Sequence, residues 1–134
     1  MKIRTREEYS KRKIRYFTKE NCPFCTDLEN NEIIFETEKW IVAYNKYPYF
    51  WDKKWLLAFP KRHIWLTIEL NNEELIDLIE VEKFMVDFYK WNDYFSFIRQ
   101  TKSNKSIEHI HYHYLPWTLS AKEIEWENYF KVKK

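Results

Sequence analysis

Short apolar runs broken by polar residues organise the first half of the chain. Residues 33–36 and 40–44 are rich in β-branched and aromatic side chains, and the polar residues 37–39 separate them. Runs of this length and composition are typical of strands, so the pattern predicts two strands linked by a turn. Residues 55–59 form a continuous apolar run that ends at Pro60, and we expect a third, buried strand there.

A long amphipathic helix is predicted after these strands. Asn71 offers a side-chain cap, and Glu74 stands three residues later, as in a capping box. Apolar side chains then recur at helical spacing, and we expect the helix to end near residues 92–93. These apolar positions are Leu75, Leu78, Ile79, Met85, Val86 and Tyr89.

Two further strands complete the pattern. Residues 94–98 and 107–114 have the composition of strands, and residues 101–104 are typical of a turn. The element order β-β-β-α-β-β predicts an α+β fold, in which a long helix packs on one face of an antiparallel five-stranded sheet. We expect the aromatic and basic segment 118–134 to be a tail that packs on this domain or on a partner.

The composition limits the chemistry that this chain can perform. Its 134 residues and 17.0 kDa suffice for one domain, and an aromatic content of 20% does not fit a disordered protein. Glycine is absent, which excludes phosphate-binding loops built on glycine, such as Walker A and Rossmann turns. Other residues must then take the left-handed turn positions, and we expect them at 30–31, 54, 92–93 and 104–105.

Charge is distributed unevenly along the chain. The formal net charge is +2, but residues 1–20 hold eight basic and three acidic side chains, which leaves the remainder slightly acidic. We therefore divide the chain into a basic N-terminal arm (1–20), a catalytic domain (21–117) and the C-terminal tail (118–134). The arm is either a solvated terminal segment or a contact for nucleic acid or another anionic surface. The longest apolar run, 55–59, is too short to span a membrane, so we expect a cytoplasmic protein.

Three histidines and two cysteines are the candidates for chemistry. His109, His111 and His113 occupy every second position, so in a strand their rings would project to one face. Imidazole is both a nucleophile and a metal ligand, so the triplet indicates a phosphate-handling site, a metal site or the polar face of an edge strand. Cys22 and Cys25 form a CxxC pair, which in a reducing compartment indicates metal binding or redox chemistry.

Several separately spaced motifs together resemble the histidine-triad (HIT) superfamily of nucleotide hydrolases and transferases. The segment HIHYHYLP at 109–116 is similar to the family signature of three histidines alternating with apolar residues. The likeness extends to YNKYPY at 44–49, LLAFPKRH at 56–63 and SIEH at 106–109, and it covers residues 20–117. The resemblance implies a HIT-like fold for the predicted sheet and helix.

The resemblance also implies roles for individual residues. His111 would be the nucleophile that forms a covalent nucleotidyl intermediate, and His113 would bind phosphate oxygens and assist the leaving group. Ser106 matches the family hydroxyl that donates to the α-phosphate, and it is counted with the two histidines as catalytic. Asn45 matches the side chain that holds the ribose hydroxyls.

The chain departs from the family pattern at two places. Lys54 and Trp55 stand where the family commonly has Gly-His, and Lys105 stands where it has an amide. A charged Lys105 would alter the phosphate contacts of the substrate. Of the pair at 99–100, we expect Gln100 to contact phosphate.

A structural zinc ion is implied by the likeness to the zinc-bearing branch of this superfamily. Its ligands would be Cys22, Cys25, His63 and His109, a Cys₂His₂ set that leaves no position open for catalysis. Two other interpretations remain open. The cysteines could form a thioredoxin-like dithiol, or all four side chains could be without metal and only hydrogen-bonded.

The function implied by the resemblance is hydrolysis of a nucleoside–phosphate linkage, in a dinucleoside polyphosphate or a nucleoside phosphoramidate. One alternative is a nucleotidyltransferase or phosphorylase, in which phosphate or a sugar phosphate replaces water. Another is a non-catalytic module that binds nucleotide, with the basic arm on a nucleic acid. Because HIT proteins are often dimers through the long helix and a sheet edge, we also expect a homodimer.

Overall fold

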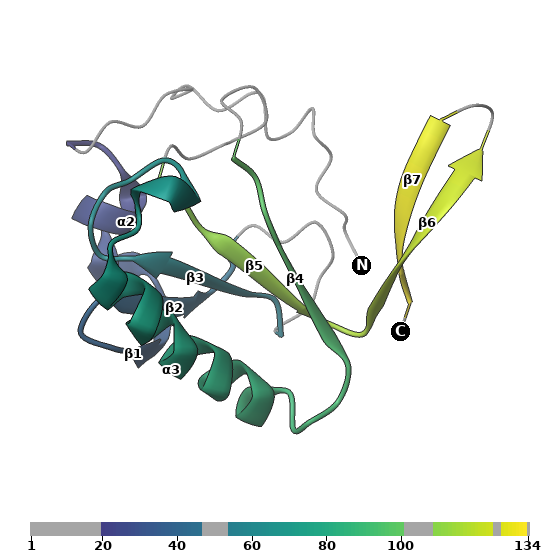
Figure 1. The fold of residues 1–134 in the computed structure, drawn as a ribbon, viewed down its shortest axis with the longest axis horizontal. Helices are drawn as coiled ribbons and strands as arrows, with labels where there is room; N and C mark the ends of the chain where they lie inside the picture. Colours follow the sequence, from purple (N-terminus) through teal and green to yellow (C-terminus); the bar gives the residue numbers. More distant parts are fainter. Residues whose placement is uncertain (1–19, 47–53, 101–108, 125–126, 134) are drawn as a thin grey trace.

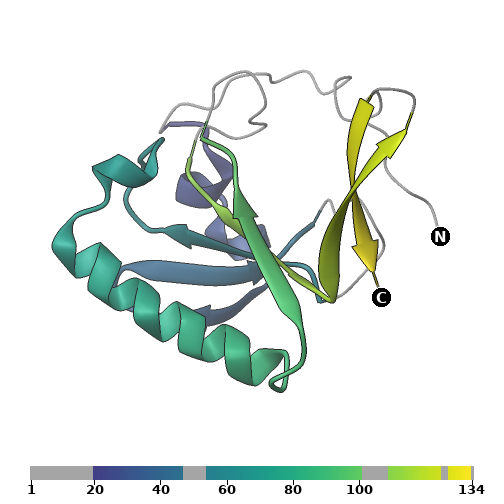
Figure 2. The same cartoon turned by 45° about the vertical axis from the view of Figure 1, so that its right-hand side comes forward.

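The computed structural model describes residues 20–46, 54–100, 109–124 and 127–133 (Figure 1). A five-stranded antiparallel sheet lies at the centre, in the order β1 (Ile33–Glu36), β2 (Trp40–Tyr44), β3 (Leu56–Pro60), β5 (Tyr112–Pro116) and β4 (Tyr94–Ile98). One long helix, α3 (Asn72–Phe88), lies across one face of this sheet (Figure 2). The short elements are α2 (Pro23–Thr26), η1 (Leu28–Asn30) and η2 (Thr67–Glu69). This arrangement confirms the predicted α+β fold.

The capping box at the start of α3 forms as predicted. The Asn71 side chain accepts a hydrogen bond from the Glu74 N–H at 2.9 Å, and Glu74 Oε1 accepts one from the Asn71 N–H at 3.0 Å. Glu74 is 2% exposed and also accepts a hydrogen bond from Arg62 at 2.7 Å. The cap therefore fixes both the first turn of the helix and the loop that leads to it.

The end of α3 differs from the prediction. The helix ends at Phe88 rather than near residues 92–93, and a Schellman-type turn closes it. In this turn the Lys90 N–H donates to the Asp87 carbonyl at 3.1 Å, and the Trp91 N–H donates to the Val86 carbonyl at 3.0 Å. The turn follows directly after Tyr89, the buried C-cap residue of the helix.

The left-handed positions also differ from the prediction. Among the described residues, Lys90, Trp91 and Trp117 have positive φ angles of 55°, 59° and 78°. The expected positions 30–31, 54 and 92–93 are not among them, and 104–105 lies outside the described residues. These three residues stand directly after α3 and β5, where the chain reverses. They take the left-handed conformation there although they carry a Cβ, which costs steric energy.

The strand that carries the histidines is shorter at its start than predicted. β5 begins at Tyr112, and residues 109–111 precede it without strand pairing. The Ile110 N–H donates instead to the Ile64 carbonyl at 2.7 Å, in the loop after β3. This bond holds the segment beside that loop and away from the ladder. Residues 107–108 of the expected strand lie outside the described residues.

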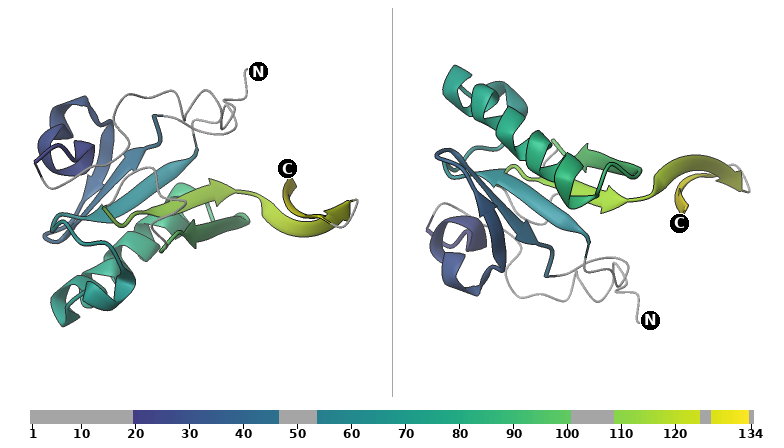
Figure 3. Two further views of the ribbon diagram at one scale, coloured as in Figure 1. Left: turned by 90° about the horizontal axis from the view of Figure 1, so that it is seen from above. Right: turned by 90° about the horizontal axis from the view of Figure 1, so that it is seen from below.

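The sheet has an apolar core on each face, between α3 on one side and α2 on the other (Figure 3). Alternate residues of β2 and β3 supply the two cores, as the period of a strand requires. The core under α3 includes Trp40, Val42, Leu56, Ala58, Val81, Met85, Ile110 and Tyr114. The opposite core contains Cys22, Phe24, Ile41, Ala43, Leu57 and Phe59.

The segment after β5 forms a second, two-stranded sheet. β6 (Thr118–Ile124) pairs antiparallel with β7 (Glu127–Lys133), and the hairpin projects from the end of β5 (Figure 1). The sequence predicts only a tail there, and its expected packing on the domain or on a partner stays a prediction. Within the described part of the chain, no helix is long and apolar enough to cross a membrane.

Candidate active site and metal centre

The three histidines lie together on the face of the sheet opposite α3. They are 0%, 7% and 4% exposed in chain order, and the rings of His111 and His113 are 4.9 Å apart. Phe24 on α2 makes edge contacts with His109 and His111, at ring distances of 5.6 and 5.3 Å. Ile110 packs in the core under α3. The predicted common face of the histidines is therefore present, although only His113 belongs to the strand itself.

The ring of His111 is oriented by the backbone before it. Its Nδ1 lies 2.8 Å from the carbonyl oxygen of His109. A carbonyl oxygen only accepts, so Nδ1–H is the donor and the lone pair is on Nε2. This tautomer gives His111 a nucleophilic nitrogen on the side of the ring away from its own backbone contact.

His113 is enclosed by aromatic side chains. Trp55 Nε1–H donates to His113 Nδ1 at 3.1 Å, and the Phe97 ring stacks on the imidazole at 4.5 Å with an interplanar angle of 6°. Burial is the main cause that lowers the pKa of His113 well below its ordinary value, and the charges of His111 and Arg99 lower it further. His113 is therefore neutral at pH 7.

Asn45 and Gln100 are both among the described residues. Asn45 follows β2, and its N–H donates to the Trp55 carbonyl at 2.9 Å, beside the start of β3. The Gln100 side chain is exposed, and its Oε1 accepts a hydrogen bond from the Thr67 N–H at 2.9 Å. Thr67 in turn lies beside the Tyr112 hydroxyl, whose ring packs with the core under α3. The Gln100 side chain is thus bound to Thr67, and its expected contact with phosphate stays a prediction.

Arg99 is the charged residue that the structure associates with the histidines. It is half-buried and follows β4, two positions after Phe97, and its charge acts on His113. Alternation continued one residue beyond the end of β4 could have identified it, since Arg99 is two positions from Phe97, which stacks on His113. Ser106 and Lys105 lie outside the described residues.

The four residues expected to bind metal converge in one cluster. Their ligand atoms all lie within 4.8 Å of one another, and the members are Cys22, Cys25, His63 and His109. Cys25 Sγ is 3.3 Å from the Nδ1 atoms of both His63 and His109, and Cys22 Sγ is 3.5 Å from His109 Nδ1. In a tetrahedral zinc site, Zn–S bonds of about 2.3 Å and Zn–N bonds of about 2.0 Å separate sulfur from nitrogen by about 3.5 Å. The observed spacing has the dimensions of such a site.

Local structure explains why these atoms converge. Cys22 is the N-cap of α2, and its carbonyl accepts hydrogen bonds from the Cys25 and Thr26 N–H groups at 3.0 and 2.9 Å, so one turn presents both sulfurs. His109 Nε2–H donates to the Pro60 carbonyl at 2.6 Å, which leaves the lone pair on Nδ1, facing the sulfurs. Burial raises the pKa of the Cys22 thiol to about 12, so a thiolate there requires a bound cation.

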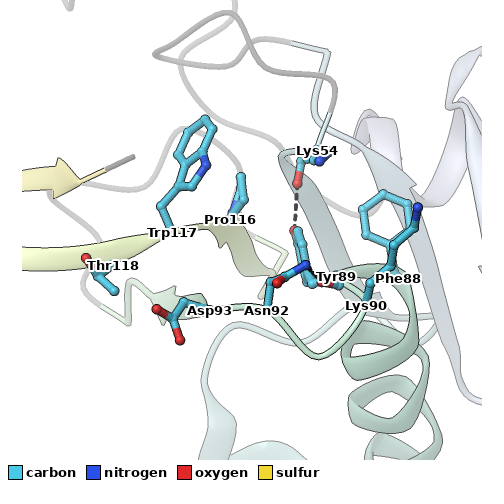
Figure 4. A pocket seen from close by; sticks show the side chains of 9 residues that line it. All are labelled: Lys54, Phe88, Tyr89, Lys90, Asn92, Asp93, Pro116, Trp117 and Thr118. Atoms are coloured by element: carbon cyan, nitrogen blue, oxygen red, sulfur yellow. Dashed lines mark hydrogen bonds between the residues drawn. The ribbon is translucent and has the colours of Figure 1, made fainter.

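Two pockets lie outside the histidine triplet. One of about 460 Å³ borders the metal cluster through Cys25 and His63. The other, of about 470 Å³, lies between the end of α3 and the junction of β5 with β6 (Figure 4). Its lining consists of Lys54, Phe88, Tyr89, Lys90, Asn92, Asp93, Pro116, Trp117 and Thr118. Lys54 precedes Trp55, so this second pocket adjoins the residue that contacts His113.

Comparison with known proteins identifies the fold. No family model matches the chain, and no curated protein matches its sequence significantly. Among solved structures, a histidine triad nucleotide-binding protein from Candida albicans is similar with a TM-score of 0.62 and 19% identity, over 81% of this chain and 79% of that one. A HIT family hydrolase from Clostridium thermocellum has a TM-score of 0.62 and 24% identity, over 75% and 94%.

A hypothetical protein from Leishmania major is similar over 87% of this chain and 86% of that one, with a TM-score of 0.67 and 20% identity. These identities establish architecture, and they leave the activity to be argued from the site. The chain therefore has the fold of the histidine-triad proteins.

Proposed function

We propose that this chain is a nucleotide phosphohydrolase that works through a covalent intermediate on His111. The observation that carries the proposal is the orientation of that ring. Its Nδ1–H is bound to the His109 carbonyl at 2.8 Å, so Nε2 holds the lone pair on the face shared by the three histidines. A neutral imidazole held this way can attack phosphorus without a catalytic metal.

The reaction would proceed in two displacements. First, Nε2 of His111 attacks the phosphorus of the nucleotidyl group. A P–N bond forms, the bond from phosphorus to the leaving group breaks, and the leaving group takes its electron pair. A water molecule then attacks the same phosphorus and forms a P–O bond, and one of its protons passes to solvent. The P–N bond breaks, and the nucleoside monophosphate departs as His111 regains its lone pair. Splitting one displacement into two lowers the barrier of each.

The other site residues would bind the substrate around this nitrogen. His113 would contact phosphoryl oxygens, and Asn45 would hold the ribose hydroxyls. Ser106 and Lys105 would contact phosphate from the segment before the triplet. Arg99 would supply positive charge, because its charge acts on His113. The Gln100 contact expected from sequence would compete with its bond to the Thr67 N–H.

A structural zinc ion would join α2 to the histidine segment. The sulfur–nitrogen distances of 3.3 to 3.5 Å support this assignment, as does the Pro60 carbonyl that directs His109 Nδ1 toward the sulfurs. Elemental analysis of protein purified without chelators is expected to give about one zinc per chain. Absence of near-stoichiometric zinc from such protein would refute the assignment.

A second copy of the chain would cover the outer face of α3. Three apolar side chains at helical spacing are exposed there, namely Leu75 (44%), Ile76 (68%) and Ile79 (55%). A helix of a monomer normally presents charged or polar residues on this side. The homodimer, a cytoplasmic location and a role of the basic arm with nucleic acid remain predictions from sequence.

Turnover of diadenosine tetraphosphate and adenosine phosphoramidate tests the hydrolase. The sharpest variant is His111→Asn, because the amide nitrogen of asparagine can still donate to the His109 carbonyl while the nucleophile is lost. We expect this variant to keep its melting temperature within a few degrees and to lose all turnover. Retention of full activity would exclude His111 as the nucleophile.

The same assay separates the alternative functions. Inorganic phosphate offered as a second acceptor would yield a nucleoside diphosphate if the chain is a phosphorylase or transferase. A chain that turns over neither substrate but binds oligonucleotides with a steep salt dependence, lost on deletion of residues 1–20, would be a binding module.

A further inference from the structure

The indole of Trp55 faces the imidazole of His113 inside the protein. Trp55 is 1% exposed and His113 is 4% exposed, and Trp55 Nε1–H lies 3.1 Å from His113 Nδ1. An indole nitrogen can only donate a hydrogen bond, so Nδ1 must be the acceptor. The proton of a neutral His113 is then on Nε2. Within the described part of the chain, this buried Nε2 has no hydrogen-bond partner, so it remains available to a ligand.

We propose that Trp55 is a positioning residue that holds His113 as the neutral Nε2–H tautomer, and that the site therefore prefers leaving groups that depart as anions. The second part rests on the proposed hydrolase function. It predicts dinucleoside polyphosphates as the substrate class, in preference to nucleoside phosphoramidates.

Protonation of His113 would break the arrangement on which this tautomer depends. A proton on Nδ1 would put two N–H groups face to face and remove the Trp55 hydrogen bond in a site that water does not reach. The charged groups that act on His113 oppose protonation too, since Arg99 after β4 and His111 before β5 both lower its pKa, after the larger effect of burial.

The backbone that carries Trp55 is fixed on both sides. The Tyr89 hydroxyl donates to the Lys54 carbonyl at 2.6 Å, at the wall of the second pocket (Figure 4), and it also lies 3.0 Å from the Tyr114 carbonyl. The Trp55 carbonyl accepts from the Asn45 N–H at 2.9 Å. These bonds fix the backbone of Trp55 relative to the residues that follow β2 and α3, and the 1% exposure of Trp55 shows that its indole is enclosed by packing.

The consequence for the reaction follows from proton balance. When a phosphoanhydride is cleaved, the P–O bond breaks and a phosphate leaves as an anion that requires no proton. When a phosphoramidate is cleaved, the P–N bond breaks and the nitrogen must gain a proton to leave as an amine. A neutral histidine held as Nε2–H can donate a hydrogen bond to a phosphoryl oxygen. It cannot act as a general acid toward the leaving nitrogen, because that requires the doubly protonated imidazolium.

Nitrogen-15 NMR of the histidine rings tests the positioning role without any substrate. In the wild type at pH 7 we expect His113 to show a protonated Nε2 and an unprotonated Nδ1. Trp55→Phe is expected to shift the tautomer ratio and the protonation equilibrium by about fivefold, the effect of one hydrogen bond of average strength. A His113 in the Nδ1–H or doubly protonated form in the wild type would overturn the proposal.

A matched control distinguishes this role from a general loss of packing. Trp40 is also fully buried, and its Nε1–H donates to the Glu74 carbonyl at 2.8 Å, in the core on the other face of the sheet. Trp40→Phe therefore also removes a buried indole hydrogen bond, and we expect a comparable loss of melting temperature with unchanged His113 signals. Equal shifts of the His113 signals in both variants would show that Trp55 contributes only packing and does not position His113.

Kinetics test the substrate preference. We expect kcat/KM for diadenosine tetraphosphate to exceed that for adenosine phosphoramidate at pH 7. Trp55→Phe should lower the ratio of these two values, and Trp40→Phe should leave the ratio unchanged. Equal efficiency on both substrates in the wild type would overturn the preference. Turnover of neither substrate would refute the hydrolase and the preference together, and the NMR result would still decide what Trp55 does.

Discussion

Glu74 offers a quantitative test of how the loop before α3 is held. Its side chain is 3% exposed and accepts hydrogen bonds from the Asn71 N–H at 3.0 Å and from Arg62 at 2.7 Å. Glu74→Ala removes the capping-box bond, about 1 kcal/mol, and the ionic hydrogen bond, discounted to about 1 kcal/mol because Arg62 is half-exposed. Lost packing of the buried methylenes adds about 1 kcal/mol.

The expected loss is therefore about 3 kcal/mol, or about 10 °C in Tm for a chain of this length. Urea denaturation followed by circular dichroism measures it. The control is Glu73→Ala in the same turn, because Glu73 is 76% exposed and its described ionic contact is a 3.3 Å surface pair with Lys39. We expect the control to change stability by no more than about 0.5 kcal/mol. Equal losses in the two variants would refute the assigned role of Glu74.

The pH dependence of stability adds an independent check. Burial by itself would raise the pKa of Glu74, but the Arg62 hydrogen bond, the Asn71 N–H and the nearby positive charges together lower it. A carboxyl whose folded pKa is depressed stabilises the fold above its unfolded pKa and loses that contribution as the pH falls. Wild-type stability should thus fall below about pH 4.5, and Glu74→Gln should make this fall shallower.

Three further outcomes are expected. Lys90→Gly should stabilise the protein by about 0.5–1 kcal/mol in urea denaturation. Glycine relieves the strain of a left-handed φ of 55°, and this gain exceeds the loss from the larger entropy of the unfolded chain; a destabilised variant would show that Lys90 is not strained. Cys25→Ser should lower bound zinc well below stoichiometric in elemental analysis and lower Tm; unchanged metal content would exclude the cluster as the site. Ile76→Lys should convert a dimer to a monomer in light scattering, whereas an unaffected dimer would move its interface off α3.

The sequence predicts the central sheet and the start of α3 well because local patterns determine them. β1, β2 and β4 have the predicted bounds, since β-branched and aromatic runs bordered by polar residues leave little freedom in where a strand begins. The start of α3 follows from its capping box. The end of α3 does not, because helical propensity continues beyond Phe88 and only the packing of the sheet decides where the chain turns.

The sequence identifies most residues of the site but not the contacts between them. The cluster of Cys22, Cys25, His63 and His109 comes from a family resemblance, because no local pattern relates residues so far apart in sequence. The contact between Trp55, the residue before β3, and His113 on β5 is likewise invisible in sequence. For Arg99 a signal is present, because the alternation of β4, continued one residue beyond its end, puts Arg99 in phase with Phe97.

The absence of glycine changes the balance between the folded and the unfolded chain. An average protein of 134 residues contains about nine glycines. Residues with a Cβ in their place restrict the unfolded ensemble, a stabilisation of about 0.4–1 kcal/mol each, or about 4–9 kcal/mol in all. Among the described residues, three left-handed positions, Lys90, Trp91 and Trp117, oppose this by about 1–2 kcal/mol each. The two effects are of similar size, so a glycine-free chain can adopt this fold at little net cost.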